Sequence, residues 1–172
     1  VSEKRINLHI DIYEGSKYYF GDITWLGNYK YSDGALDTVL NIKKGTVFDP
    51  ALLETRLYQD PAGLDVSSLY LDDGYLFFNA QPVETQVRKD TIDLEIRITE
   101  GPQATYERII LEGNTKTSDH VVLREIRTLP GNKFSRSEII RSQREILNLG
   151  FFDQENIQVN PIPHPEKGTV DI

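Results

Sequence analysis

The side chains that could catalyse a reaction or bind a metal ion are few in this chain. There are three histidines and no cysteine, so thiolate chemistry and disulfide bonds are excluded. The histidines are His9, His120 and His164, and no pair of them has the spacing of a metal-binding motif. We therefore expect no metal site and no bound cofactor.

Carboxylates are more numerous, but they are equally dispersed. Asp and Glu total 27, and they are scattered over the polar positions of candidate strands and over candidate loops. No set of Ser, His and Asp typical of a nucleophilic enzyme can be assembled, and no Gly-rich phosphate-binding loop is present. The sequence predicts a protein without catalytic residues and without enzyme activity.

The net charge argues against a nucleic-acid partner. The chain has a formal charge of −8 and a pI of about 4.9, whereas neutralising phosphates requires a basic surface. One stretch, from Lys116 to Arg144, is nevertheless rich in Lys and Arg. It is either a solvated helix surface or a surface for an acidic partner protein or an anionic membrane surface.

Alternating aliphatic residues identify the elements that must position any binding site. In Ile6–Gly15, and again in Ile92–Gly101, an aliphatic residue occupies every second position until a Glu-Gly turn. Side chains alternate between the two faces of a strand, so each stretch predicts a strand with one apolar and one polar face. A third copy begins at Thr169–Ile172.

These strands belong to a longer internal repeat. Gly15 aligns with Gly101 at an offset of 101 − 15 = 86 residues, whereas Gly74 aligns with Gly150 at an offset of 76. The first copy therefore holds ten extra residues, which we place around YQDPAGLDVSS, where Pro61 would interrupt a helix. The offset of 86 also aligns Gly27-Asn28 with Gly113-Asn114 and Ser32-Asp33 with Ser118-Asp119.

The repeat predicts an α+β fold of two tandem β-α-α-β-β domains, each a three-stranded mixed sheet covered on one face by two helices. Residues 1–14 would be the final strand of a preceding domain, 15–100 a whole domain, and 101–172 a domain truncated in its final strand. The expected strands are Tyr18–Leu26, Leu76–Val87 and Thr91–Thr99 in the first unit, and Thr105–Glu112, Phe152–Val159 and Thr169 onward in the second.

This repeated unit resembles the POTRA domain. The resemblance rests on Gly-Asn after the first strand and on Gly-Tyr or Gly-Phe after the second helix. In the second unit, IILEGNTKTSDHVVLREIRTLPGNKF followed by REILNLGFFD is similar to the last POTRA domain of the BamA family, the proteins that assemble outer-membrane β-barrels. The resemblance covers the whole chain. It implies that residues 15–100 are the penultimate POTRA domain and residues 101–172 the last one.

The resemblance implies a periplasmic binding and scaffolding module of an outer-membrane protein. The implied partners are unfolded outer-membrane protein clients, accessory assembly lipoproteins and a C-terminal membrane β-barrel of the same chain. Two alternatives stay open. One is the POTRA region of another outer-membrane translocator, of the two-partner secretion type. The other is a periplasmic glycan-binding or enzymatic domain with a similar two-layer fold.

The first candidate site is a sheet edge. A small sheet leaves edge strands unpaired, and an extended client can add a further strand there through backbone hydrogen bonds. The penultimate strand of this fold is expected at an edge of the sheet. Prolines flank both copies of this strand, which agrees with an edge position because edge strands tolerate proline. The predicted client-binding residues are Val83, Glu84, Thr85, Gln86 and Val87, with Ile157, Gln158 and Val159 in the second unit.

The second candidate site is the LREIR segment of the second unit. We expect a helix there, with Leu123 and Ile126 facing the sheet. Arg124 and Arg127, three residues apart, would then share one helix edge and meet a carboxylate of a partner. The resemblance implies that Arg124, Glu125 and Arg127 help to dock an accessory lipoprotein.

Overall fold

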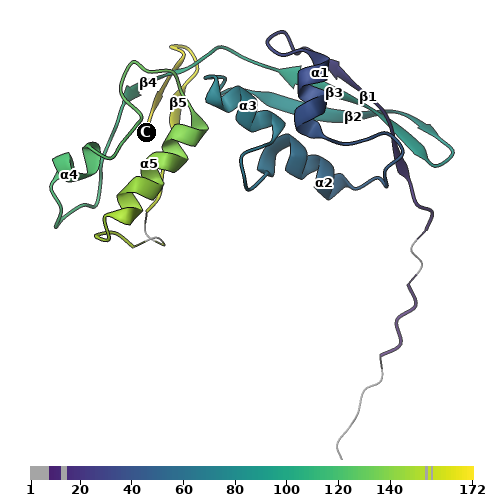
Figure 1. The fold of residues 1–172 in the computed structure, drawn as a ribbon, viewed down its shortest axis with the longest axis horizontal. Coiled ribbons are helices and arrows are strands. Elements are labelled where there is room, and N and C mark those ends of the chain that lie inside the picture. The colour runs from purple at the N-terminus through teal and green to yellow at the C-terminus, as the bar shows by residue number, and fades with distance from the viewer. Residues whose placement is uncertain (1–7, 13–14, 154, 156) are drawn as a thin grey trace, which may run out of the picture.

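The computed structural model describes residues 8–12, 15–153, 155 and 157–172. Two units lie side by side in an elongated, bent arrangement, and each is a small sheet with helices on one face (Figure 1). Each sheet has three strands and contains both parallel and antiparallel pairs. The predicted α+β class is confirmed. No helix in the described part of the chain has the length and apolar character needed to cross a membrane.

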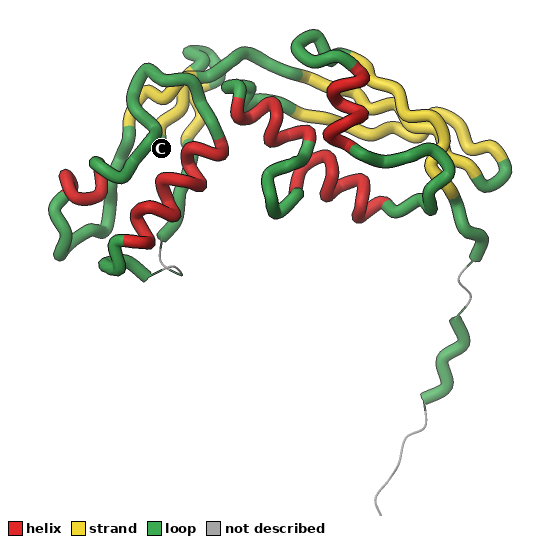
Figure 2. Tube along the Cα trace, in the orientation of Figure 1, coloured by secondary structure: helices red, strands yellow, loops and turns green. Residues whose placement is uncertain are grey.

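The first unit places its last strand in the middle of the sheet. The strand order is β1-β3-β2, with β3 parallel to β1 and antiparallel to β2. The helices all cover one face of this sheet (Figure 2). The elements are β1 Tyr19–Leu26, α1 Asp33–Leu40, α2 Pro50–Glu54, the π-helix η1 Thr55–Gln59, α3 Val66–Asp72, β2 Asn79–Arg88 and β3 Thr91–Thr99.

The first unit has more helical segments than the two we predicted. The helix that begins at Pro50 continues through η1 and ends at Gln59, and a new helix begins at Val66. The break contains Pro61, at the place where the sequence suggested an interruption. Asp65 then starts α3, because its buried carboxylate accepts a hydrogen bond from the backbone N–H of Ser68 at 2.7 Å.

The second unit repeats this topology with shorter elements. Its strand order is β4-β6-β5, equivalent to β1-β3-β2. Strand β4 ends at Arg108, so the predicted strand Thr105–Glu112 is too long, and α4 is only five residues. The elements are β4 Thr105–Arg108, α4 Asp119–Leu123, α5 Arg136–Asn148, β5 Ile162–His164 and β6 Thr169–Asp171.

The penultimate strand of the second unit is not where we predicted it. We expected a strand over Phe152–Val159, but Ile157–Val159 belongs to no strand and β5 is Ile162–His164. The turn between β5 and β6 is short, and it pairs His164 with Thr169. A strand register is fixed by its turn, so the segment opposite β6 has to be the proline-rich one.

The strand predicted near the N-terminus is not found in the described residues. Leu8–Ile12 has no regular structure, and Leu8, Ile10 and Ile12 are between 75% and 85% exposed. The rest of that predicted strand lies outside the described residues. No described strand pairs with Leu8–Ile12, and an extended segment needs such pairing to form a stable strand.

The two units share a packed joint. Leu71, Leu76 and Phe77 of the first unit pack against the small core of the second. Polar contacts add to this packing, because Asp72 accepts hydrogen bonds from the backbone N–H of Ser137 at 2.7 Å and from Ser135 Oγ at 3.0 Å. The first unit thereby supplies a capping carboxylate to the N-terminus of α5.

A second carboxylate strengthens the joint from its rim. Asp73 lies between Lys133 of the second unit and Lys30 of its own unit, at 2.8 Å from each Nζ atom. The hydrogen bonds from Lys133 and Lys30 hold the pKa of Asp73 below its ordinary value. The amide of Gln103 also donates to the carbonyl of Asp73 at 2.8 Å.

Candidate strand-addition edge and docking surface

The orientation of β2 is revealed by a contact at Ala80. The backbone N–H of Ala80 donates to the hydroxyl of Tyr58 at 2.9 Å, and the same hydroxyl donates to the carbonyl of Ala80. Both backbone groups of Ala80 therefore point away from β3, toward the free edge of the sheet. Alternate residues of a strand point the same way, so Pro82 and Glu84 also face this edge.

A bulge resets this alternation in the second half of β2. The pairing register shifts between Glu84 and Gln86, which leaves Thr85 as the extra residue, and its hydroxyl donates to the carbonyl of Asp93 at 3.2 Å. Beyond the bulge, Val87 pairs with Ile92, and it faces outward again. Pro82 has no N–H, so Glu84 and Val87 carry the outward-facing N–H groups that remain.

The start of the opposite edge is covered in both units. In the first unit, the N–H of Phe20 donates to the carbonyl of Thr46 at 2.9 Å, and the N–H of Gly45 donates back to Phe20 at 2.7 Å. In the second unit, Tyr106 makes the equivalent bonds with Asn132 and Gly131. The loop before the second helix thus acts as a short extra strand on β1 and β4, and β2 offers the freer edge.

The edge of the second unit is closed by proline. Pro163 pairs with Val170, as Val87 pairs with Ile92 in the first unit. The neighbouring strand pairs match too, since Tyr106 lies opposite Val170 and Phe20 opposite Ile92. Pro163 therefore faces the free edge and offers no N–H to an added strand.

The residues Ile157, Gln158 and Val159 line a groove instead of forming an edge. The groove holds about 590 Å³ and lies beside α5, with Ile109, Ile139 and Ile146 among its lining residues. Our prediction of a client-binding edge at Ile157–Val159 is therefore wrong, because these residues precede β5.

The LREIR segment is a turn and not a helix. Helix α4 ends at Leu123, and Arg124 is its C-cap. Leu123 is 44% exposed, so the prediction that it faces the sheet with Ile126 is wrong. The chain turns because the backbone N–H of Arg127 donates to Ser142 Oγ on α5 at 2.8 Å.

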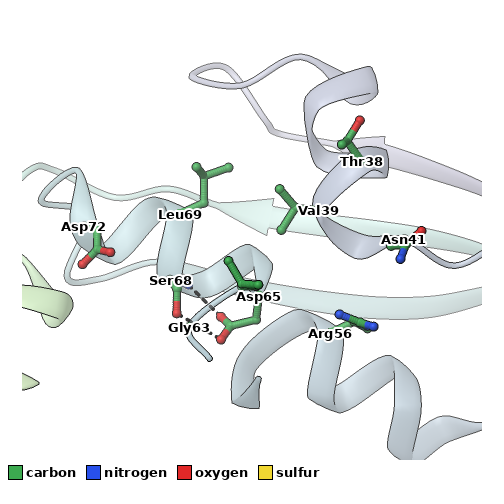
Figure 3. Close-up of a pocket in the computed structure, with 10 residues that line it drawn as sticks. Thr38, Val39, Asn41, Arg56, Gly63, Asp65, Ser68, Leu69 and Asp72 are labelled. Carbon is green, nitrogen blue, oxygen red and sulfur yellow. Dashed lines mark hydrogen bonds between the residues drawn. The ribbon is translucent and has the colours of Figure 1, made fainter. Parts of the chain in front are cut away.

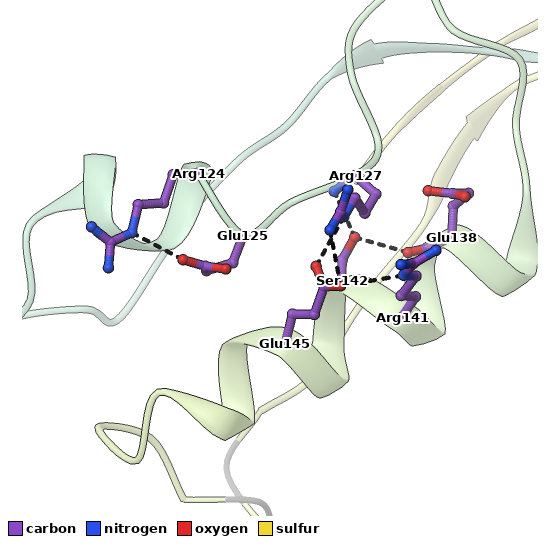
Figure 4. A network of polar contacts seen from close by, with 7 residues as sticks. All are labelled: Arg124, Glu125, Arg127, Glu138, Arg141, Ser142 and Glu145. Carbon is purple, nitrogen blue, oxygen red and sulfur yellow. Dashed lines mark hydrogen bonds and ion pairs between the residues drawn. The ribbon is translucent and has the colours of Figure 1, made fainter.

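The charged groups of this segment are paired within the chain (Figure 4). Arg124 Nε lies 2.9 Å from Glu125 Oε1, and Arg127 Nε lies 3.0 Å from Glu145 Oε2. Hydrogen bonding by Arg127 lowers the pKa of Glu145, and Arg141 adds to the effect. Arg124 is the C-cap of α4 and Arg127 lies beyond the helix, so the shared helix edge that we predicted for these two residues is not present.

The comparison with known proteins decides the family. The profile of the POTRA family, described as a surface antigen variable number repeat, matches residues 18–101 and 104–172. The chain belongs to the POTRA family. The two matches coincide with the two structural units, so each unit is one POTRA domain.

Known proteins are similar to almost the whole chain. The outer membrane protein assembly factor BamA of Neorickettsia risticii is 27% identical over 94% of this chain, and that of Neisseria meningitidis serogroup B is 26% identical over 99%. The chain spans 21% and 23% of those two proteins. The crystal structure of Haemophilus influenzae BamA POTRA3-5 has the same fold, with a TM-score of 0.75 at 18% identity, over 92% of this chain and 60% of that one.

The first POTRA unit also has a pocket that we did not predict from sequence. It holds about 460 Å³ and opens between α1 and the segment from η1 to α3 (Figure 3). Arg56 lies at its wall and pairs with Asp60 at 3.3 Å. Gly63 and Leu64 of the inserted stretch line it, so the signal in the sequence was the ten-residue insertion.

The second POTRA unit brings together acidic and histidine side chains from three strands. Glu107, His164 and Asp171 offer ligand atoms within 4.8 Å of one another, the one such group found among the residues that the structure describes. Cations already satisfy the carboxylates: Arg108 donates to Asp171 at 2.5 Å, and Lys167 Nζ lies 3.4 Å from Glu107. Hydrogen bonding by Arg108 lowers the pKa of Asp171. The group is an ion-pair network across the sheet.

Proposed function

We propose that this chain is part of the periplasmic region of an outer-membrane protein assembly factor, and that β2 of its first POTRA unit receives extended client segments by strand addition. The similarity to BamA proteins of two bacteria over nearly the full chain supports the setting. The observation that carries the site is the outward orientation of Glu84 and Val87 on an exposed edge strand.

The edge is suited to weak and unselective binding. An added strand pairs through backbone groups, so its affinity depends little on the client sequence. The bulge at Thr85 separates the two outward N–H groups by three residues instead of two. A client strand therefore meets a short and irregular edge, which limits aggregation as well as affinity.

The test uses a soluble strand-forming peptide as the client probe. The probe is a synthetic peptide with the sequence of Thr91–Thr99, which already pairs with β2 inside the molecule; it is called the β3 peptide below. We expect it to slow amide exchange at Glu84 and Val87. Equal protection of the helices, or none on β2, would contradict the proposal.

Two variants of one residue separate backbone from side-chain effects. Glu84→Pro removes the outward N–H and should weaken binding of the β3 peptide about fivefold, the value of one hydrogen bond. Pro82 shows that the edge tolerates proline. Glu84→Ala keeps the N–H and is the matched control, with unchanged affinity expected.

The second POTRA unit is proposed to dock an accessory lipoprotein through Glu125, with Arg124 and Arg127 beside it. Glu125 is partly exposed and Arg124 is its only ion-pair partner in the described ranges, so a partner cation can compete for it. Reversal by Glu125→Lys should weaken binding of the purified lipoprotein at least about tenfold, within the range for desolvated interface charges. Unchanged affinity in a titration, with the circular dichroism spectrum preserved, would remove Glu125 from the surface.

The remaining partners are proposed from the same setting. A C-terminal membrane β-barrel would anchor the module, and the basic side chains around α5 would face an anionic membrane surface. Two of these cations, Arg127 and Arg141, are already paired with Glu145. The membrane contact is therefore proposed as weak and dependent on salt.

A further inference from the structure

Tyr58 occupies a position that an added strand would need. Its hydroxyl forms hydrogen bonds with both backbone groups of Ala80, which face the free edge of β2. A strand that paired along the whole edge would place its own N–H and carbonyl at this point. The tyrosine side chain thus substitutes for one pair of strand-to-strand hydrogen bonds.

The element that holds Tyr58 is specific to the first POTRA unit. Tyr58 lies on the π-helix η1, at the start of the stretch in which we placed the ten extra residues, and it packs against the first core. In the second unit, the stretch that corresponds to α2, η1 and α3 is one regular helix, α5. A π-helix inserts an extra residue into a helical turn and often marks a functional position.

The hydroxyl of Tyr58 is in the neutral form, which can donate. The pKa of Tyr58 is raised, mainly because burial disfavours the phenolate. The neutral hydroxyl can accept from the N–H of Ala80 and donate to its carbonyl at the same time. Both edge groups are satisfied by one side chain fixed on a helix.

We propose that Tyr58 sets the end of the strand-addition site on β2, so that an extended client pairs from Val87 to Glu84 and is stopped before Ala80. The inference rests on the proposed function and adds to it the residue that determines the length of the bound segment. Pro82, which offers a carbonyl and no N–H, lies between the open and the closed part of the edge.

Two substitutions test this stop. Tyr58→Phe removes the hydroxyl and keeps the ring, so amide exchange at Ala80 in the free protein should become about tenfold faster. Tyr58→Leu keeps apolar contact with the core but clears the edge. The β3 peptide should then bind about 5-fold to 25-fold more tightly, because one or two further hydrogen bonds become available.

The exchange pattern distinguishes the possible results. In the unsubstituted protein, the bound peptide should protect Glu84 and Val87; in Tyr58→Leu, the protection should extend to Ala80. Tyr29→Ala, at a side chain that is 92% exposed, is the control and should bind as the unsubstituted protein does.

Two results would overturn the inference, and they differ in what else they overturn. If the peptide protects Glu84 and Val87 in both proteins, but Tyr58→Leu shows neither tighter binding nor protection at Ala80, Tyr58 does not set the end of the site. If β2 is protected in neither protein, the proposed strand addition is wrong as well.

Discussion

The two POTRA units share one topology, but they differ in what the described part of each central strand adds to a core. In the first unit, Ile96 and Ile98 in the second half of β3 are buried on its helix-facing side. In the second unit, the described part of the central strand is β6, Thr169–Asp171, and a groove lies beside α5. The core of the first unit therefore depends on the second half of its central strand.

Two equivalent glycines, Gly27 and Gly113, differ in how closely other atoms approach them. Both Gly27 and Gly113 have positive φ, 89° and 85°, which favours glycine. A Cβ atom at Gly27 would lie 2.2 Å from the carbonyl oxygen of Ile98, whereas a Cβ at Gly113 would meet nothing within 4 Å. Close approach of β3 constrains the first glycine, and the second lacks such a neighbour among the described residues.

The second half of β3 should contribute strongly to the stability of the first core. Ile96 is fully buried, so Ile96→Ala should lower the free energy of unfolding by about 2–5 kcal/mol. Urea denaturation followed by circular dichroism measures the change. Arg97→Ala, on the exposed face of the same strand, is the control. A loss below about 1 kcal/mol for Ile96→Ala would show that this part of β3 does not support the core.

The sequence predicted the parts of the fold that local chemistry determines. Asp49 accepts from the backbone of Ala51 and Leu52 at the start of α2, and Ser135 accepts from the backbone of Glu138 in α5, so each cap acts within three residues. The internal repeat also located the insertion. Caps and repeats depend on residues close in sequence or on equivalent positions, so they can be found without a structure.

The parts that were missed depend on contacts between distant residues. The position of β5 follows from its register with β6, and the turn at LREIR follows from a bond between Arg127 and Ser142. The edge role of Tyr58 depends on Ala80, 22 residues away. No periodicity in the sequence reports such pairs, so an alternating segment at Ile157–Val159 was assigned to the strand.

Removing a polar contact at the joint between the two units should lower stability by less than removing Ile96 does. Asp72→Ala removes the carboxylate that bonds to the N-terminus of α5, and loss of such a cap costs about 1 kcal/mol. Thermal unfolding of the second unit should shift accordingly. Glu166→Ala, at an exposed turn, removes the same charge away from the joint and should leave the midpoint unchanged. Equal shifts in both variants would show a net-charge effect only.

The joint should also weaken in acid. The pKa of Asp73 is lowered by Lys133 and Lys30, so its contribution is present above the pKa of an unfolded Asp, about 3.9. The contribution is lost as the pH falls from there through the lowered pKa. Asp73→Asn should reduce the difference in stability between pH 5 and pH 3. An unchanged pH dependence would assign the acid sensitivity to other carboxylates.

The smallest expected effect on stability concerns the edge of the second unit. Pro163 faces the free edge of β5 and lacks an N–H, so Pro163→Val restores one outward donor without altering the pairing with β6. A substitution at this exposed residue should change stability by less than about 0.5 kcal/mol. Binding of the β3 peptide to the second unit should instead increase about fivefold, the value of one hydrogen bond. Amide exchange at position 163 with and without peptide measures this directly.

Glu166→Val, in the neighbouring turn, adds the same side chain without an edge donor. If it promotes binding equally, the apolar side chain and not the N–H is responsible, and the two edges do not differ in the way that their prolines indicate.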